Sequence, residues 1–231
     1  TSGRKRKPLE LIVTALLYVL KEGVSWRALD VPGVAWQTVY GYFRRWSRSG
    51  MLAEVCRHLK WPKQDRARAI DSTCIKVHKD GANPAGGQTT QALGRTKGGL
   101  NTKLHAAVDG QGRPVSIVLT PGQAGDSPQA IGLLHDAGRW RLVMMDKAYD
   151  SDEIRSYIES QGGEACIPPR SNRKTGIDYD REAYKRRSVV ENFFEKIKRC
   201  RRIGTRYDKL DESFFAFVML AITTLYLRDQ F

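Results

Sequence analysis

The sequence has few residues of the kinds that build thiolate or imidazole metal centres. Its four cysteines form no Cys-x-x-Cys pair, which excludes a zinc ribbon and a disulfide framework and favours a reducing cytosol. Its four histidines show no metal-ligand spacing, so we interpret them as ordinary surface or packing residues. These residues are Cys56, Cys74, Cys166, Cys200, His58, His78, His105 and His135.

Long hydrophobic runs are also absent. The longest apolar stretches, Leu11–Leu20 and Phe214–Leu227, are shorter than the roughly 20 residues that span a bilayer. The first follows a basic segment and superficially resembles a signal peptide, but no small-residue cleavage site comes after it. We therefore expect two helices of a folded core and no membrane partner. The chain begins at Thr1 and not at methionine, which suggests a trimmed N-terminus.

Acidic residues are the minority among the charged ones. The 231 residues include 39 Lys and Arg against 25 Asp and Glu, which gives a formal net charge of +14. Such an excess favours a polyanionic partner, and nucleic acid is the commonest of these. The length allows one large domain or two small ones. Charge alone does not separate a protein that only binds nucleic acid from an enzyme that acts on it.

The N-terminal third reads as short helices separated by tight breaks such as Pro32-Gly33. The second helix carries Arg44 and Arg45, and the arrangement is typical of a helix-turn-helix unit. A plain helical bundle that packs on the next domain is equally compatible with the pattern. We predict a helical DNA-binding domain over residues 1–62 and an α/β domain over residues 63–231. The predicted helices cover residues 8–22, 35–47 and 51–59.

Two strands of the second domain carry candidate acids. Residues 67–77 alternate as a strand does, and Asp71 shares a face with small and apolar side chains. A buried carboxylate needs a cation or hydrogen bonds, so a metal or a nearby Lys or Ser would explain it. The apolar run Leu142–Met145 predicts a central strand that ends directly in Asp146. Open α/β sheets place their sites at such carboxyl ends.

The other elements of this domain complete a mixed sheet. Residues 81–99 read as a flexible loop that carries Arg95 and Lys97, and such a loop covers an active site or is plain surface. Asp150 or Ser151 would cap the helix at residues 152–160. We expect the last helix to pack against the sheet. The remaining predicted elements are strands at 104–108, 115–119 and 165–167 and helices that begin near 127 and 212.

Residues 184–198 predict one helix with an unusual polar stripe. Tyr184, Arg187, Glu191 and Lys198 fall within a sector about 60° wide at about 100° per residue. A solvated polar face is the alternative explanation of this stripe. Glu195 lies on the same stripe, so periodicity alone does not decide which glutamate is functional.

The motifs resemble those of bacterial DDE transposases of insertion sequences, of the insertion-sequence family four/five type. The matching segments are DSTCIKVHK, GGLNTKLHAAVDGQGRP, LTPGQAGDSPQA, MMDKAYDS, IPPRSNRK and YKRRSVVENFFEKIKRCRRIGTRYDK. The last of these fits the family's Y-x2-R-x3-E-x6-K signature without a gap. The resemblance implies a ribonuclease H-like fold with a mixed five-stranded sheet flanked by helices. It favours Glu191 over Glu195.

By this resemblance Asp71, Asp146 and Glu191 would be the catalytic acids and would hold two divalent ions, Mg²⁺ or Mn²⁺. Hard carboxylate oxygens suit these ions, and an ion pair can activate a nucleophile and stabilise a leaving oxygen. We expect cleavage at the ends of a mobile element and transfer of those ends into target DNA, by a homodimer on double-stranded DNA in the nucleoid-associated bacterial cytoplasm. The expected DNA contacts are Tyr184, Arg187, Lys198, Arg44, Arg45, Arg95 and Lys97.

Two other functions remain compatible with the residues. One is a ribonuclease H-like nuclease that cuts DNA but never joins it. The other is a domesticated DNA-binding protein with an idle catalytic centre, which the presence of all three acids argues against.

Overall fold

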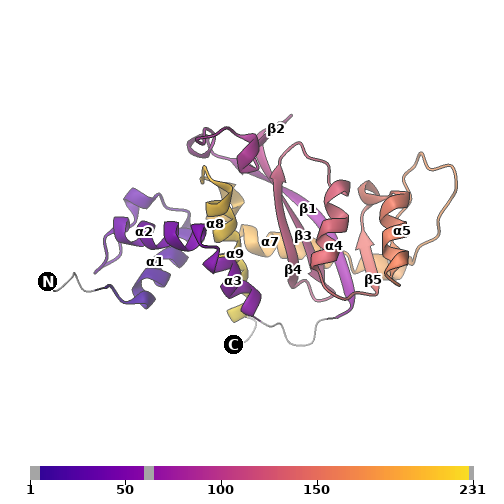
Figure 1. Cartoon of the computed structure of the whole chain (residues 1–231), viewed down its shortest axis with the longest axis horizontal. Coiled ribbons are helices and arrows are strands. Elements are labelled where there is room, and N and C mark those ends of the chain that lie inside the picture. Colours follow the sequence, from indigo (N-terminus) through magenta and orange to yellow (C-terminus); the bar gives the residue numbers. More distant parts are fainter. Residues whose placement is uncertain (1–5, 60–64, 229–231) are drawn as a thin grey trace. The chain divides into compact units, whose positions relative to one another are not determined.

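The computed structural model describes residues 6–59 and 65–228, and it divides into two compact units (Figure 1). We call them the helical unit (residues 1–60, 77–85 and 197–231) and the sheet unit (residues 61–76 and 86–196). The helical unit thus combines both ends of the chain. The domain boundary predicted at residues 61–63 lies outside the described residues.

The helical unit contains the three N-terminal helices that were predicted, within one or two residues. Helix α1 ends at Gly23, whose φ of 69° is left-handed and whose N–H donates to the Val19 carbonyl at 2.9 Å. This cap confirms the predicted end of the helix. The unit also contains the short strand β7 (Thr205–Arg206). Its α-helices are α1 (Leu9–Glu22), α2 (Trp36–Arg48), α3 (Met51–His58), α8 (Arg201–Gly204) and α9 (Asp211–Arg228).

The last helix forms the centre of this unit. We expected it to pack against the sheet, but α9 packs against α1, α2 and α3, so that prediction is wrong. Its first half is buried on every side, and the Phe217 ring stacks on Phe43 at 4.4 Å and on Trp26 at 6.1 Å. The three N-terminal helices are too short to bury their apolar faces alone, and α9 supplies the surface that they lack.

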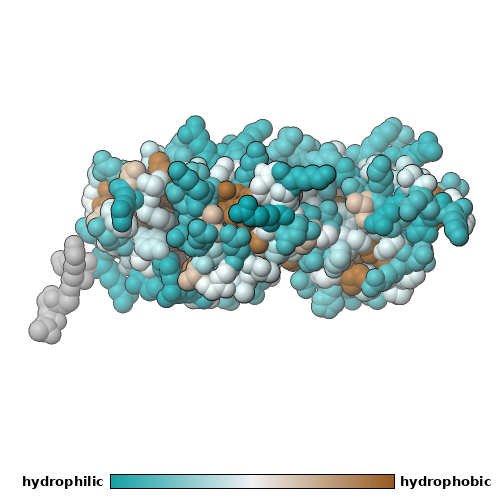
Figure 2. Space-filling model, turned by 90° about the horizontal axis from the view of Figure 1, so that it is seen from above, coloured by the Kyte–Doolittle hydropathy of each residue, from teal (hydrophilic) through white to brown (hydrophobic). Residues whose placement is uncertain are grey.

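Within the described part of the chain, no helix is long and apolar enough to cross a membrane. The face shown in Figure 2 is mostly hydrophilic, with small separate hydrophobic patches.

The sheet is mixed, as predicted. Its strand order is β2-β3-β1-β5-β6. Strand β4 pairs with residues 102–108 of β3, whereas β2 pairs with residues 99–101 of the same strand. The pairs β1–β3, β3–β4 and β2–β3 are antiparallel, whereas β1–β5 and β5–β6 are parallel. The strands are β1 (Ala67–Val77), β2 (Gly94–Thr96), β3 (Gly99–Asp109), β4 (Pro114–Pro121), β5 (Leu142–Met145) and β6 (Glu164–Cys166).

The sheet has seven strands and not the five predicted. The additional ones are β2 and β7, which have three and two residues and are therefore too short to show an alternating pattern. Strand β2 also corrects the prediction of a continuous loop over residues 81–99, because residues 94–96 pair with residues 99–101.

Helices α4 (Ala130–Asp136) and α5 (Asp152–Ser160) share one hydrophobic core with the sheet. Leu133 and Ile158 from these helices pack with Ile70 of β1 and Val143 of β5, and all four are essentially inaccessible to solvent. The Ser151 hydroxyl accepts the Ile154 N–H at 3.2 Å and caps α5. This packing fixes the two central parallel strands that carry the candidate acids.

The predicted single helix over residues 184–198 is wrong. The segment forms α6 (Arg181–Lys185) and α7 (Ser188–Lys198), with a turn at residues 186–187. In this turn the backbone N–H groups of Arg187 and Val190 donate to carbonyls three residues earlier.

The turn exists because its two arginines bind acids of the sheet unit. Arg186 donates to Asp65 at 3.0 Å, and Arg187 donates to Asp71 at 2.7 Å. Charge-assisted hydrogen bonds of this kind outweigh the small loss of helical backbone bonding. Tyr184 and Glu191 therefore lie on different helices.

Candidate active site

Asp71 lies within β1, and Asp146 directly follows its parallel neighbour β5 at the same level. The register pairs Ala67 with Leu142 and continues to Ile70 with Met145. Asp71 and Asp146 are the next residues along the two chain segments, and residues opposite each other on parallel strands point to the same face. The structure thus brings two of the three predicted acids together.

Asp71 is a partly buried carboxylate with hydrogen-bond donors on both oxygens. Its Oδ1 accepts the Ser72 N–H at 2.7 Å, and its Oδ2 accepts Arg187 Nη1 at 2.7 Å. Burial raises its pKa and Asp146 adds to the rise, while Ser72 and Arg187 lower it; the net shift is upward. A second cation near this pair would favour the ionised form.

Arg187 connects Asp71 to Glu191. Its Nη1 binds Asp71 and its Nη2 donates to Glu191 Oε1, so one guanidinium bridges a strand and the helix α7. The guanidinium also lies 5.7 Å from the centre of the Tyr184 ring. Burial lowers the pKa of Arg187, but Asp71 and Glu191 outweigh burial and raise it overall. Arg187 thus connects Asp71, Tyr184 and Glu191 in one site. The Glu191 side chain is 52% exposed and lies at the rim of this site.

In the described residues, no group of three His, Cys, Asp or Glu side chains lies close enough to hold a metal ion. Arg187 accounts for this, because its guanidinium binds both Asp71 and Glu191. The donor set itself fits a hard divalent cation, since it consists of carboxylate oxygens, two of which come from adjacent strand positions.

The sequence did not predict a polar cluster of Asp126, Lys103 and Ser72, the residue after Asp71. Asp126 accepts a hydrogen bond from the Ser72 hydroxyl at 2.8 Å and pairs with Lys103 at 2.9 Å. The Lys103 ammonium also donates to the Ala124 carbonyl at 2.6 Å. Asp126 lies within the quoted segment LTPGQAGDSPQA, and that motif was the only signal that pointed to it.

His105 and Tyr149 belong to the same surroundings. His105 is fully buried, its Nε2 lies 2.8 Å from Thr120 Oγ1, and burial lowers its pKa to about 4. Tyr149 is 1% exposed; burial and then the charges of Asp126, Asp71 and Asp146 raise its pKa. The full burial of His105 confirms its interpretation as a packing residue.

Asp150 has a structural role. Its carboxylate accepts hydrogen bonds from Arg155 Nε at 2.9 Å, Arg173 Nε at 2.9 Å and the Arg170 N–H at 2.8 Å. Burial would raise its pKa, but these donors lower it to about 2. Ser151 provides the helix cap, so Asp150 instead ties β5, α5 and the loop after β6 together.

Three of the other predicted DNA contacts lie on the sheet unit. Arg95 is exposed on β2, and Lys97 is exposed in the turn between β2 and β3. The Tyr184 ring on α6 packs against Tyr179 at 5.6 Å. Glu195, the alternative third acid, is exposed on α7.

Arg44, Arg45 and Lys198 lie in the helical unit. Arg44 donates to the Tyr40 hydroxyl at 3.2 Å, and Arg45 lies 4.5 Å from the centre of the Tyr42 ring. Both arginines are thus oriented by aromatic side chains of α2. Lys198 ends α7 and is partly buried.

Comparison with known proteins decides the family. A family model described as "Transposase DDE domain" matches residues 62–226. The chain belongs to the DDE transposase family. A second model, "Putative transposase of IS4/5 family", matches residues 1–56. The protein is therefore an enzyme of the DDE transposase type, and enzymes of this family use divalent metal ions.

Two proteins of similar sequence are named as transposases of insertion sequences. A Brucella ovis protein, "Putative transposase for insertion sequence element IS6501", is 42% identical over 130 residues, which are 56% of this chain and all of that protein. A Burkholderia cepacia protein, "Putative transposase for insertion sequence element IS402", is 27% identical over 147 residues, which are 55% of this chain and 67% of that protein.

A solved structure is similar in fold. The piggyBac transposase synaptic complex with hairpin DNA gives a TM-score of 0.54 at 8% identity, over 98% of this chain and 66% of that chain. The mixed sheet flanked by helices is accordingly ribonuclease H-like, as predicted.

Proposed function

We propose that this transposase cleaves DNA at the ends of an insertion sequence and transfers the freed 3′ ends into target DNA. The observation that carries the proposal is the position of Asp71 in β1 and Asp146 directly after β5, one residue beyond the last pair of these parallel strands and next to an arginine that also holds Glu191. Membership of the DDE family supports the same reaction.

Asp71, Asp146 and Glu191 would hold two Mg²⁺ or Mn²⁺ ions. When bound, the ions activate the attacking oxygen and stabilise the leaving oxygen of the phosphodiester. The positively charged guanidinium of Arg187 lies between Asp71 and Glu191, where a metal ion bound by these two carboxylates would lie. Its release from the carboxylates would free a guanidinium for a DNA phosphate, which is the contact that the Y-R-E-K signature implies.

We propose that the helices within residues 1–62 bind the terminal inverted repeats. Arg44 and Arg45, which tyrosines hold in place, would contact the backbone or base edges. Arg95 and Lys97 on the β2–β3 turn, with Tyr184 and Lys198, would add phosphate contacts. Two related ends must be handled together, so the working form would be a homodimer on DNA in the bacterial cytoplasm, associated with the nucleoid.

The test uses Asp146→Asn with Asp136→Asn as a matched control. Asp136 is an exposed aspartate in the sheet unit, and its side chain contacts the neighbouring His135. The substrate is an end-labelled duplex that carries the inverted repeats flanking the gene, incubated with Mg²⁺, Mn²⁺ or EDTA. We expect cleavage by the wild type and the control in either metal, and none by Asp146→Asn.

Unchanged cleavage by Asp146→Asn would overturn the assignment of the acids. A second reaction with pre-cleaved ends and a plasmid target tests strand transfer. Cleavage without a joined product would instead identify a nuclease.

A further inference from the structure

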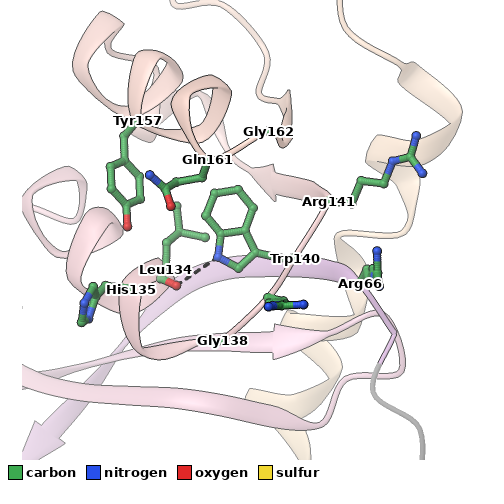
Figure 3. A pocket seen from close by; sticks show the side chains of 10 residues that line it. Arg66, Leu134, His135, Gly138, Trp140, Arg141, Tyr157, Gln161 and Gly162 are labelled. Carbon is green, nitrogen blue, oxygen red and sulfur yellow. Dashed lines mark hydrogen bonds between the residues drawn. The ribbon is translucent and has the colours of Figure 1, made fainter.

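A basic pocket lies at the amino ends of β1 and β5, and its Arg66 and Arg141 are each five residues before Asp71 and Asp146. Its volume is about 630 Å³, and Figure 3 shows the side chains around it. It forms where β1 and β5 begin and where α5 ends. The residues that matter below are Arg66, Arg139, Trp140, Arg141 and Tyr157, which we call the arginine pocket.

Backbone pairing brings two of its arginines side by side. The Arg141 N–H donates to the Arg66 carbonyl at 2.7 Å, just before the register of β1 and β5 begins. Arg66, Arg139 and Arg141 are all exposed, and within the described ranges none of them makes an ion pair with a carboxylate. Like charges held together without counter-charges repel one another, so an anionic ligand would stabilise the arrangement.

A buried arginine holds the wall of the pocket in place. Arg68 is 1% exposed and donates to the backbone carbonyls of Ala137 at 3.0 Å, Arg139 at 3.0 Å and Asp65 at 2.6 Å. Burial lowers its pKa, and Asp109 and Asp65 oppose that shift. Arg68 therefore fixes the segments on either side of the pocket and adds positive potential behind it.

The aromatic part of the pocket is fixed as well. Trp140 Nε1 donates to the Leu134 carbonyl at 3.0 Å, and the Tyr157 ring lies 6.4 Å away. A Cβ atom at Gly163 would come within 2.4 Å of the indole, so only glycine leaves room for this ring position. In Figure 3 the indole stands in the middle of the pocket, between Tyr157 on one side and Arg141 on the other.

We propose that the arginine pocket binds backbone phosphates of DNA, as a contact site separate from the three carboxylates. The inference rests on the proposed function, which makes DNA the substrate. Guanidinium groups bind phosphate oxygens in a bidentate manner, and a fixed aromatic ring offers a stacking surface to an unpaired base.

The spacing suits one continuous DNA segment. Arg66 and Asp71 are five positions apart on an extended strand, which is roughly 16 Å at about 3.3 Å per residue. Five steps along a DNA strand at about 3.4 Å each cover a similar length. Arg66 and Asp71 are an odd number of positions apart, so their side chains project to opposite faces of the sheet. A DNA segment of sufficient length that lies at the acids would therefore continue around the amino end of β1 to the arginine pocket, where positive charge offsets the repulsion between its phosphates and the carboxylates.

The test compares Arg139→Ala/Arg141→Ala with Lys79→Ala/Lys209→Ala, whose residues lie outside the proposed DNA-binding helices of residues 1–62. The control pair removes the same charge from exposed residues of the helical unit that make no ion pair in the described part of the chain. Binding of a fluorescein-labelled duplex of arbitrary sequence is followed by anisotropy in EDTA over a series of salt concentrations. Loss of two phosphate contacts should make the slope of log K against log salt shallower by about 1.8.

We expect that change for the pocket variant and an unchanged slope for the control pair. Arg139→Lys/Arg141→Lys should restore most of the slope, because lysine keeps the charge. A labelled single strand forms a second arm. Because the slope per phosphate is smaller for single strands, the loss of two phosphate contacts should make the single-strand slope shallower by about 1.4.

A wild-type slope in the pocket variant, or an equal change in the control pair, would overturn the inference. Thermal unfolding of each variant confirms that it is folded. The outcome is independent of the catalytic proposal, because Asp146→Asn should lose cleavage while it keeps the wild-type salt slope. If Asp146→Asn still cleaves, the catalytic proposal fails whatever the slope; if only the slope result is negative, this inference alone fails.

Discussion

Two regions of the β1–β5 pair carry opposite charge. Asp71 in the middle of β1 and Asp146 directly after β5 lie side by side, and their negative charge is balanced in part by Arg187. At the amino ends Arg66 and Arg141 stand side by side without a carboxylate partner in the described residues. The same pairing of parallel strands therefore builds an acidic site and a basic site only a few residues apart. A protein that acts on a polyanion needs both, since the acids that perform the chemistry repel the substrate.

The largest expected effect tests whether the acidic site depends on Glu191. Glu191→Gln should slow single-turnover cleavage of the labelled duplex by about a thousandfold, which corresponds to about 4 kcal/mol in the barrier. Glu195→Gln should cleave like the wild type, because Arg187 ties Glu191 and not Glu195 to Asp71. If Glu195→Gln lost as much activity, the third acid would be wrongly assigned.

A second prediction tests whether Asp150, which is close in sequence to Asp146, stabilises the fold. Asp150→Asn should lower the free energy of unfolding by about 3 kcal/mol, because it leaves the buried guanidinium of Arg155 without its charge partner and removes one of the two carboxylate partners of Arg173. Asp152→Asn should change stability by less than about 0.5 kcal/mol, since its side chain is 85% exposed. Urea unfolding measures both. Equal losses would mean that Asp150 is no more important to the fold than a surface residue.

The third prediction concerns pH and the buried histidine near Asp126. His105 has a pKa of about 4 in the folded protein against about 6.5 when unfolded, so the unfolded chain binds more protons between these values. Stability should therefore fall as the pH falls, by about 2 kcal/mol between pH 7 and pH 5.

His105→Gln should lose most of this pH dependence in urea unfolding at the two pH values. The matched control is His135→Gln, because the His135 side chain is 80% exposed. Retention of the full pH dependence by His105→Gln would assign it to other groups.

The smallest effect is expected at the basic site. Arg139→Ala/Arg141→Ala should alter the free energy of unfolding by no more than about 0.5 kcal/mol, because both side chains are exposed and make no ion pair in the described residues. The cleavage rate of this double variant at saturating DNA should stay within about twofold of the wild-type rate. A fall in stability above about 1 kcal/mol would show that these arginines support the fold, and the contrast between the two sites would be lost.

Local pattern was sufficient for much of the fold. The strands at residues 67–77 and 142–145 and the helix at residues 152–160 match their predicted bounds, because each depends on periodicity and caps within its own segment. The positions of Asp71 and Asp146 on two central strands follow from the same local signals. A sheet in which these strands are parallel neighbours then brings the two acids together.

The amino-acid sequence thus determined the elements, the mixed sheet and the position of two candidate acids on it. Tertiary structure alone decided the rest: the turn that divides residues 184–198, the bridge from Asp71 through Arg187 to Glu191, the packing of α9, and the arginine pocket. The reason is physical. These features depend on ion pairs and buried surfaces between residues far apart in the chain, whose energies exceed the local preferences that a sequence pattern reports.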